Sequence, residues 1–299
     1  MLLFSVLVVF VVGAFAAPRP VVMWHGMGDT CCNPLSLGMH LSQSLCCILI
    51  EKHIPGVFVH SLQIGENAID DEMNGFLKPI AEQIPYAFEQ IMGVPQLQSG
   101  FNAIGFSQGG QFLRAFVQQY NYPPVHNLIT LGAQHQGVYG MPRCPGANSS
   151  LCEMARKLLD VGAYVPFVQK RLVQAEYWHD AINENNYVAK NIWLPGMNNE
   201  LAEKNETYKQ NLQSLNAFVM VQFTEDTMVQ PRSSEYFGFY GPGQDKVEVT
   251  LQETQLYQQD WLGLQTMELQ NKLHFIPCVG DHLQFSDTWF VNNIIPFLQ

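Results

Sequence analysis

Six short apolar runs, separated by longer stretches with helical spacing, limit the folds open to this chain. The runs are rich in Val, Ile and Phe and have the length of strands; they cover residues 21–24, 57–62, 101–106, 127–133, 218–223 and 273–279. Apolar residues with helical spacing lie between or after them, for example in 35–53, 108–120 and 285–295. Strands that alternate with helices are typical of a parallel sheet flanked by helices. We therefore predict an α/β fold with a mostly parallel sheet.

One interval interrupts this alternation. Residues 134–215 contain no clear strand, but turns rich in Pro, Gly and Cys and then helical segments such as 151–178. An insertion between two core strands most often covers the active edge of a sheet, and a peripheral helical decoration is the alternative. We expect a single domain over residues 17–299, with a helical cap at about 134–215.

The first 16 residues have the features of a signal peptide. They are apolar, carry no charged side chain and end in Ala14-Phe15-Ala16, although the usual basic residue near the start is missing. A membrane-spanning helix needs about 20 apolar residues, and this run is shorter. The alternative is a buried first strand, but residues 21–24 already supply one. We expect cleavage after Ala16, entry into the secretory pathway, and no transmembrane segment.

The charge and the motifs exclude several classes of function. The chain has 15 basic and 26 acidic residues, a net charge of -11, which disfavours binding to nucleic acid or anionic lipid. Neither a Cys-x-x-Cys nor a His-Glu-x-x-His motif is present, so we expect no metal and no other cofactor. The sequons at Asn148 and Asn205 agree with secretion and are predicted glycosylation sites.

Seven cysteines in a secreted chain predict disulfides and one unpaired thiol. Cys144 and Cys152 lie close together in the sequence and form the first predicted pair. The doublet at 31–32 could form a disulfide between neighbours. The doublet at 46–47 falls in a predicted helix, where ordinary packing is the alternative.

The stretch Gly105-Phe106-Ser107-Gln108-Gly109 marks a candidate nucleophile. A Gly-x-Ser-x-Gly match is common by chance, but this one follows a predicted strand and opens a predicted helix. That context is required of a nucleophile elbow, in which the flanking glycines permit a sharp turn. The start of the helix also places amide donors beneath the serine. We predict that Ser107 is a catalytic nucleophile.

A nucleophilic serine needs a base and an orienting acid, and in this architecture the acid precedes the histidine in the chain. His282 follows the last apolar run and a Gly-Asp turn, whereas His274 lies inside that run and is expected to pack. Asp226 follows the preceding run, with its neighbour Glu225 as the rival. Asp281 is too close in sequence to orient the imidazole easily. We therefore predict Asp226 and His282.

Two backbone amides are predicted to stabilise an oxyanion. One belongs to Gln108, the residue after the serine, and the other to Met27, in the loop after the first apolar run. His25 begins that loop, and we expect it to shape the loop rather than to accept a proton.

Several blocks resemble the palmitoyl-protein thioesterase family from about residue 20 to the C-terminus. They are HGMGDTCCNP, GFSQGGQFLRA, HQGVYGMPRCPG, RLVQAEYWHD, SEYFGFYGPGQ, LQETQLYQQDWLGL and GDHLQFSDTWF. The family has the α/β-hydrolase fold and removes long-chain fatty acyl groups from cysteine thioesters. The resemblance implies a triad of Ser107, Asp226 and His282, with oxyanion amides at Met27 and Gln108. It also implies S-palmitoylated proteins or peptides as substrates, and a lysosomal location.

The resemblance extends to finer features. It implies that the acyl chain lies under the cap, near Leu172, Val173, Trp178 and Met228, although each of these could equally be ordinary core. It also implies one disulfide between Cys31 and Cys32 and another between Cys144 and Cys152.

The chain departs from the family pattern in three places. A third family disulfide has no counterpart, because no cysteine lies near residues 88 and 120. Cys46, Cys47 and Cys278 are additional. A family sequon beside the catalytic aspartate is missing, since Glu225 occupies the position of its asparagine.

Taken together, these features predict a serine hydrolase that cleaves palmitoyl thioesters through an acyl-serine intermediate. An oxygen-ester lipase or esterase could share every catalytic residue and is one alternative. A catalytically silent lipid-binding protein on a hydrolase scaffold is the other, and the complete triad argues against it.

Overall fold

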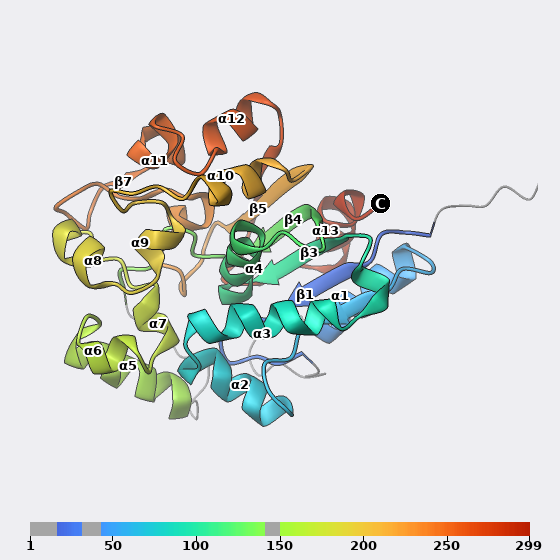
Figure 1. Cartoon of the computed structure of the whole chain (residues 1–299), viewed down its shortest axis with the longest axis horizontal. Helices are drawn as coiled ribbons and strands as arrows, with labels where there is room; N and C mark the ends of the chain where they lie inside the picture. The colour runs from blue at the N-terminus through green and yellow to red at the C-terminus, as the bar shows by residue number, and fades with distance from the viewer. Residues whose placement is uncertain (1–16, 32–42, 141–149) are drawn as a thin grey trace, which may run out of the picture.

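The computed structural model describes residues 17–31, 43–140 and 150–299 (Figure 1). Its centre is a six-stranded sheet in the order β2-β1-β3-β4-β5-β8, and every neighbouring pair is parallel. The strands are β1 Val21–Trp24, β2 Val59–Ser61, β3 Phe101–Phe106, β4 Val125–Leu131, β5 Ala217–Phe223 and β8 Leu273–Cys278. Each coincides with a predicted apolar run, which confirms the predicted parallel α/β fold.

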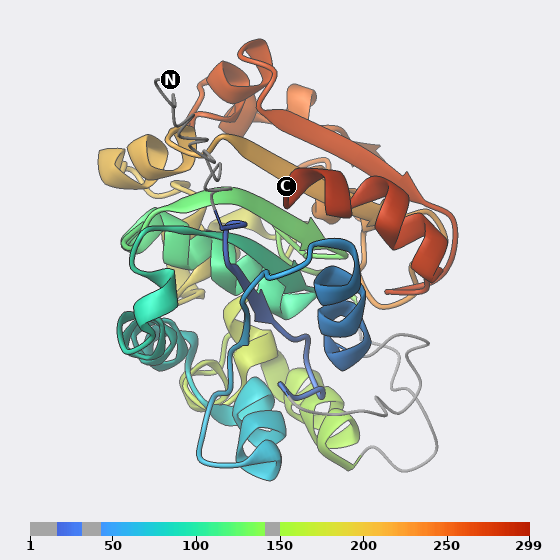
Figure 2. The same ribbon diagram turned by 90° about the vertical axis from the view of Figure 1, so that its right-hand side faces the viewer.

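Helices cover both faces of this sheet. Alternate residues of β1 are buried on opposite sides: Val21 packs with one apolar core and Val22 with the other. The first core is closed by α1 Gln43–His53 and α13 Asp287–Asn293, and the second by α3 Ile80–Met92 and α4 Gln108–Gln119 (Figure 2). A strand covered on both faces needs apolar side chains at every position. This explains why the strands appear in the sequence as continuous apolar runs.

The regular elements in the described part of the interval between β4 and β5 are helices, joined by turns and irregular segments. Its helices are α5 Ser150–Gly162, α6 Pro166–Gln169, α7 Val173–Glu176, α8 Glu184–Lys190, α9 Leu194–Met197 and α10 Glu206–Gln213. In the described residues of this interval, the only strand-like pairing is an isolated bridge between Val138 and Trp178. In Figure 1, α5 to α9 lie together beside the edge of the sheet where α4 begins.

The remaining elements complete the periphery. Within the described residues they are α2 Ala68–Leu77, α11 Gln255–Gln258, α12 Leu264–Leu269, the antiparallel pair β6 Phe239–Tyr240 and β7 Glu248–Val249, and the 3-10 helices η1 Pro95–Leu97, η2 Arg232–Tyr236, η3 Leu251–Glu253 and η4 Ile295–Phe297. No helix in the described part of the chain is long and apolar enough to cross a membrane.

Helix α4 approaches the sheet so closely that only glycine fits at the crossing. A Cβ on Gly105 would lie 2.3 Å from the Cα of Gly110, and a Cβ on Gly109 would lie 2.3 Å from the carbonyl oxygen of Trp24. Both distances are far below a normal contact, so the backbones of α4, β1 and β3 touch directly. This contact places the N-terminus of α4 at the carboxyl ends of the two strands.

Candidate active site

Ser107 occupies the sharp corner between β3 and α4. Its backbone has φ 50° and ψ -122°, a region that residues other than glycine rarely adopt. Two hydrogen bonds hold the corner: the Ser107 N–H donates to the carbonyl of Leu131 (2.7 Å), and its carbonyl accepts from the N–H of Gly110 (2.9 Å). The serine lines a pocket at this edge of the sheet. This is the backbone geometry of a nucleophile elbow.

Asp226 and His282 meet at the same edge, from the loops that follow β5 and β8. The imidazole Nδ1 donates to Asp226 Oδ2 at 2.5 Å. The other oxygen, Oδ1, accepts from the backbone N–H groups of Met228 (2.7 Å) and Val229 (2.8 Å). Burial alone would raise the pKa of Asp226, but the charge and hydrogen bond of His282 outweigh it and hold the pKa below its usual value. The carboxylate is therefore ionised, and with the proton on Nδ1 the imidazole Nε2 is free to act as a base.

The turn after β4 lies next to both the serine corner and the imidazole. Ser107 is hydrogen-bonded to Leu131, and the next residue, Gly132, lies against the His282 ring. A Cβ on Gly132 would be 3.0 Å from the ring atom Cε1, and its φ of +64° also favours glycine. Sequence reasoning did not identify Gly132, because a single glycine after a strand has many other uses.

The alternative acids and bases are placed elsewhere. Glu225 is exposed, and His274 lies within β8, where its ring packs against an aromatic ring near the C-terminus. Asp281 accepts from the backbone N–H groups of Thr227 (2.8 Å) and His282 (2.7 Å), and so ties the two loops together. The imidazole of His282 is therefore contacted by Asp226, the residue predicted to orient it.

Both predicted oxyanion amides belong to residues near the serine: Gln108 follows it in the chain, and Met27 lines the same pocket. Neither Met27 nor Gln108 donates its backbone N–H to an acceptor among the described residues. The Gln108 side chain is clamped: its Nε2 donates to the carbonyl of Gly75 (2.9 Å), and its Oε1 accepts from the hydroxyl of Tyr177 (3.0 Å) and from Gln174 (3.3 Å). These bonds join α4 to α2 and α7, and they fix the residue that carries one of the amides.

A buried ion pair anchors the loop that carries Met27. His25 Nε2 donates to Asp71 Oδ1 (2.8 Å) and Nδ1 donates to the carbonyl of Gly26 (2.9 Å). Both ring nitrogens thus face acceptors, which requires an imidazolium. Burial lowers the pKa of His25, but the hydrogen bond and charge of Asp71 outweigh it, so the pKa is raised. The Asp71 carboxylate also accepts from the N–H of Cys31 (2.9 Å), and it links this loop to α2.

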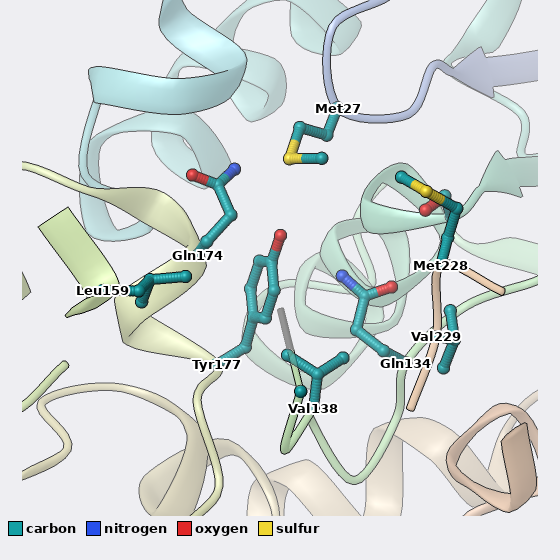
Figure 3. Close-up of a pocket in the computed structure, with 10 residues that line it drawn as sticks. Met27, Gln134, Val138, Leu159, Gln174, Tyr177, Met228 and Val229 are labelled. Carbon is teal, nitrogen blue, oxygen red and sulfur yellow. The ribbon is translucent and has the colours of Figure 1, made fainter. Parts of the chain in front are cut away.

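The pocket at Ser107 has an uncharged and mainly apolar lining. Its walls are Met27, Ser107, Gln134, Val138, Gly140, Leu159, Gln174, Tyr177, Met228 and Val229. Figure 3 shows Met27 and Met228 reaching in from two different loops, with the hydroxyl end of Tyr177 directed toward the space between them. Such a lining accepts a neutral, apolar ligand and offers no counter-charge to an ionised one.

Only one of the four residues suggested for the acyl chain lines this pocket, namely Met228. Leu172 and Val173 are completely buried among core side chains, and Trp178 is half-buried against the ring of Tyr139. The lining residues come from separate loops and helices, so no spacing in the sequence indicated them.

The cysteines are in two states. Cys31 and Cys152 are each disulfide-bonded, while Cys32 and Cys144, their predicted partners, lie outside the described residues. The three additional cysteines are free thiols: Cys46, Cys47 and Cys278.

The structure describes one of the two predicted glycosylation sites. Asn148 lies outside the described residues. Asn205 is exposed and caps α10, where its side-chain oxygen accepts from the N–H of Thr207 (3.0 Å). No group of three His, Cys, Asp or Glu residues that could hold a metal ion occurs in the described part of the chain.

Comparison with known proteins gives one consistent result. The family model described as Palmitoyl protein thioesterase matches residues 20–282, a range that contains Ser107, Asp226 and His282. The chain is 48% identical over 276 residues to palmitoyl-protein thioesterase 1 of Caenorhabditis elegans, covering 92% of this chain and 90% of that one. It is 34% identical over 302 residues to palmitoyl-protein thioesterase 3 of Dictyostelium discoideum, covering 98% and 96%. Lysosomal thioesterase PPT2 of Rattus norvegicus is 24% identical over 264 residues, covering 88% and 81%.

Proposed function

This chain belongs to the palmitoyl protein thioesterase family, whose members remove palmitoyl groups from proteins, and on that premise we propose that Ser107, Asp226 and His282 perform the hydrolysis here. One observation carries the proposal. The Asp226–His282 hydrogen bond and the Ser107 elbow, which come from three separate loops, flank the same turn after β4. Such an arrangement of alcohol, imidazole and carboxylate performs acyl transfer.

The proposed reaction has two steps. His282 takes the proton of Ser107 Oγ as that oxygen attacks the thioester carbonyl, while Asp226 holds the imidazole and stabilises its charged form. The amides of Met27 and Gln108 donate to the oxyanion of the tetrahedral intermediate. Collapse expels the cysteine sulfur, which takes the proton from His282 and departs as the thiol, leaving an acyl-serine and a neutral imidazole. A water molecule, activated by the same imidazole, then releases the fatty acid.

The pocket supports the choice of a fatty acyl substrate. Each methylene buried against its apolar wall contributes about 0.8 kcal/mol, partly offset by ordering of the chain. The sulfur-containing side chains of Met27 and Met228 are flexible, and such side chains adapt to an acyl chain of varied conformation. We propose S-palmitoylated proteins and peptides as the substrates.

The cellular location and the domain organisation of the chain are also proposals. A signal peptide at residues 1–16 and the sequons at Asn148 and Asn205 would route the chain through the secretory pathway. The relative from Rattus norvegicus is named a lysosomal thioesterase, which favours the lysosome as the destination. We propose a mature chain of one domain, residues 17–299, with residues 134–215 forming a cap.

The test compares matched palmitoyl thioester and palmitoyl oxygen-ester substrates. The wild type is expected to show the higher kcat/KM on the thioester. Ser107→Ala should lower kcat by roughly a million-fold, as loss of a triad serine does elsewhere, with an unchanged Tm. Ser214→Ala, at an exposed position after α10, is the matched control and should keep full activity. A preference for the oxygen ester would overturn the substrate class, and an active Ser107→Ala would overturn the nucleophile.

A further inference from the structure

Besides Asp226, one more carboxyl group is buried near the candidate triad. Glu235 belongs to η2 and has 0% of its surface exposed. Its Oε2 accepts the N–H of Phe223, the last residue of β5, at 2.8 Å. Its other oxygen, Oε1, is equally buried and receives no N–H or O–H from a described residue. An ionised carboxylate with an unpartnered oxygen in such a place is costly.

Asp226 and Glu235 both bind the backbone of Phe223: the Asp226 N–H donates to the Phe223 carbonyl (3.2 Å), and Glu235 accepts the Phe223 N–H. Their carboxyl groups are within hydrogen-bonding reach of each other. Two carboxylates in contact cannot both ionise, so such a pair shares a proton. Asp226 accepts three other hydrogen bonds, from His282 and two backbone amides, whereas Glu235 accepts one. Three donors stabilise the ionised form of Asp226, and the proton therefore belongs to Glu235.

We propose that Glu235 is a protonated positioning residue, whose O–H donates to Asp226 and helps to orient the carboxylate that holds His282. This inference rests on the proposed role of the triad and adds a residue to it. Glu235 makes no contact with substrate in this scheme. It acts through Asp226 alone.

The groups around Glu235 agree with this protonation state. Burial, followed by the charge and hydrogen bond of Asp226, raises the pKa of Glu235 well above its usual value; the N–H of Phe223 and the charge of Arg232 oppose the rise. Burial also raises the pKa of the Cys278 thiol to about 11, and it raises the pKa of the Tyr236 hydroxyl. Both are therefore neutral in the physiological range. The titratable and charged groups near Glu235 are Asp226, Arg232, Tyr236 and Cys278, with His282 reached through Asp226.

The proton on Glu235 has a consequence for the reaction at acidic pH. A second negative charge beside Asp226 would stabilise the imidazolium form of His282, which cannot act as a base. With Glu235 neutral, the imidazole faces a single negative charge. The acid limb of the pH profile of kcat/KM reports this balance for the free enzyme.

The test compares Glu235→Gln and Glu235→Leu with the wild type, using kcat/KM on a palmitoyl thioester across pH. Glutamine is neutral, can accept from the Phe223 N–H and can donate an N–H to Asp226. Leucine keeps the burial but removes the donor. Glu235→Leu should lower kcat about tenfold, the scale of a lost hydrogen bond to a charged group, with KM unchanged. Its acid limb should move to higher pH, because the Asp226 charge that the Glu235 O–H partly neutralises then acts in full on the imidazole. Glu235→Gln should recover most of that loss and keep the acid limb of the wild type.

Two results would overturn the inference. A shift of the acid limb to lower pH in Glu235→Gln would mean that Glu235 is ionised in the wild type. A Glu235→Leu profile identical to the wild type would mean that the residue does not position Asp226. If leucine prevents folding, the near-isosteric glutamine variant decides alone. Ser107→Ala, assayed in parallel, keeps the two ideas apart: if it is active the proposed function fails, and if it is inactive only the role of Glu235 is in question.

Discussion

A single methyl group added at Gly109 should disturb both the stability and the chemistry of this protein. Gly109 lies in the first turn of α4, and an ideal Cβ there would be 2.3 Å from the carbonyl oxygen of Trp24 and 2.4 Å from that of His25. Non-bonded atoms prefer separations of about 3.5–4.0 Å. Both obstacles are backbone atoms, which cannot rotate away as a side chain can. Either α4 or the end of β1 must therefore move by about 1 Å.

The cost follows from that movement. Overpacking a tight core costs about 1–3 kcal/mol, and a backbone obstacle places Gly109→Ala near the upper end. Replacing glycine by alanine also stabilises by about 0.4–1 kcal/mol, because the unfolded chain loses freedom. The net loss is about 2 kcal/mol, or roughly 3–4 °C in Tm for a chain of this length. The same shift displaces the amide of Gln108, and losing one oxyanion donor lowers kcat by about 100- to 1,000-fold. A partial displacement should cost at least about tenfold.

Calorimetry measures the Tm. The kcat is measured from turnover of a palmitoyl thioester at a temperature well below that of thermal unfolding. Gly196→Ala in α9 is the matched control, since among the described residues the nearest atom to its Cβ would be Leu201 Cδ1, at 3.9 Å. That variant should be as stable as the wild type or more so, with unchanged kcat. If Gly109→Ala has the same Tm and kcat as Gly196→Ala, the close crossing of α4 does not hold the oxyanion site in place.

Two further predictions concern buried ionisable groups. Burial raises the pKa of Glu176 from its ordinary value of 4.5 to about 8, so the folded state retains a proton that the unfolded state loses. Stability therefore falls as pH rises between these values. Glu176→Gln should therefore raise the free energy of unfolding more at pH 8 than at pH 5, and an equal gain at both would contradict this. The pKa of His25 is raised from 6.5, so its pairing with Asp71 stabilises below about pH 6.5 and fades as pH rises through the raised value. Asp71→Asn should cost about 3–5 kcal/mol at pH 5 and less at pH 8 in urea unfolding, and the reverse order would refute it.

Much of the fold was accessible from sequence because its signals are local. A strand buried on both faces is apolar at every position, and a helix at the surface is apolar every three to four residues. The elbow at Ser107 was equally local, since the glycines, the strand and the helix that define it are neighbours in the chain. Residues after three parallel strands must meet at one edge of the sheet, so Asp226 and His282 could be named from their positions in the chain.

The tertiary structure alone decided the surroundings of those residues. Nothing near Glu235 in the sequence indicates that its carboxyl lies against Asp226, nor that Gly132 is packed against the imidazole. The pairing of His25 with Asp71 joins residues 46 positions apart. The Gln108 side chain is likewise hydrogen-bonded to Tyr177, which follows α7. Such contacts depend on how loops and helices pack after the sheet has formed. They leave no periodic pattern in the sequence, because each is made by one pair of side chains whose separation along the chain is arbitrary.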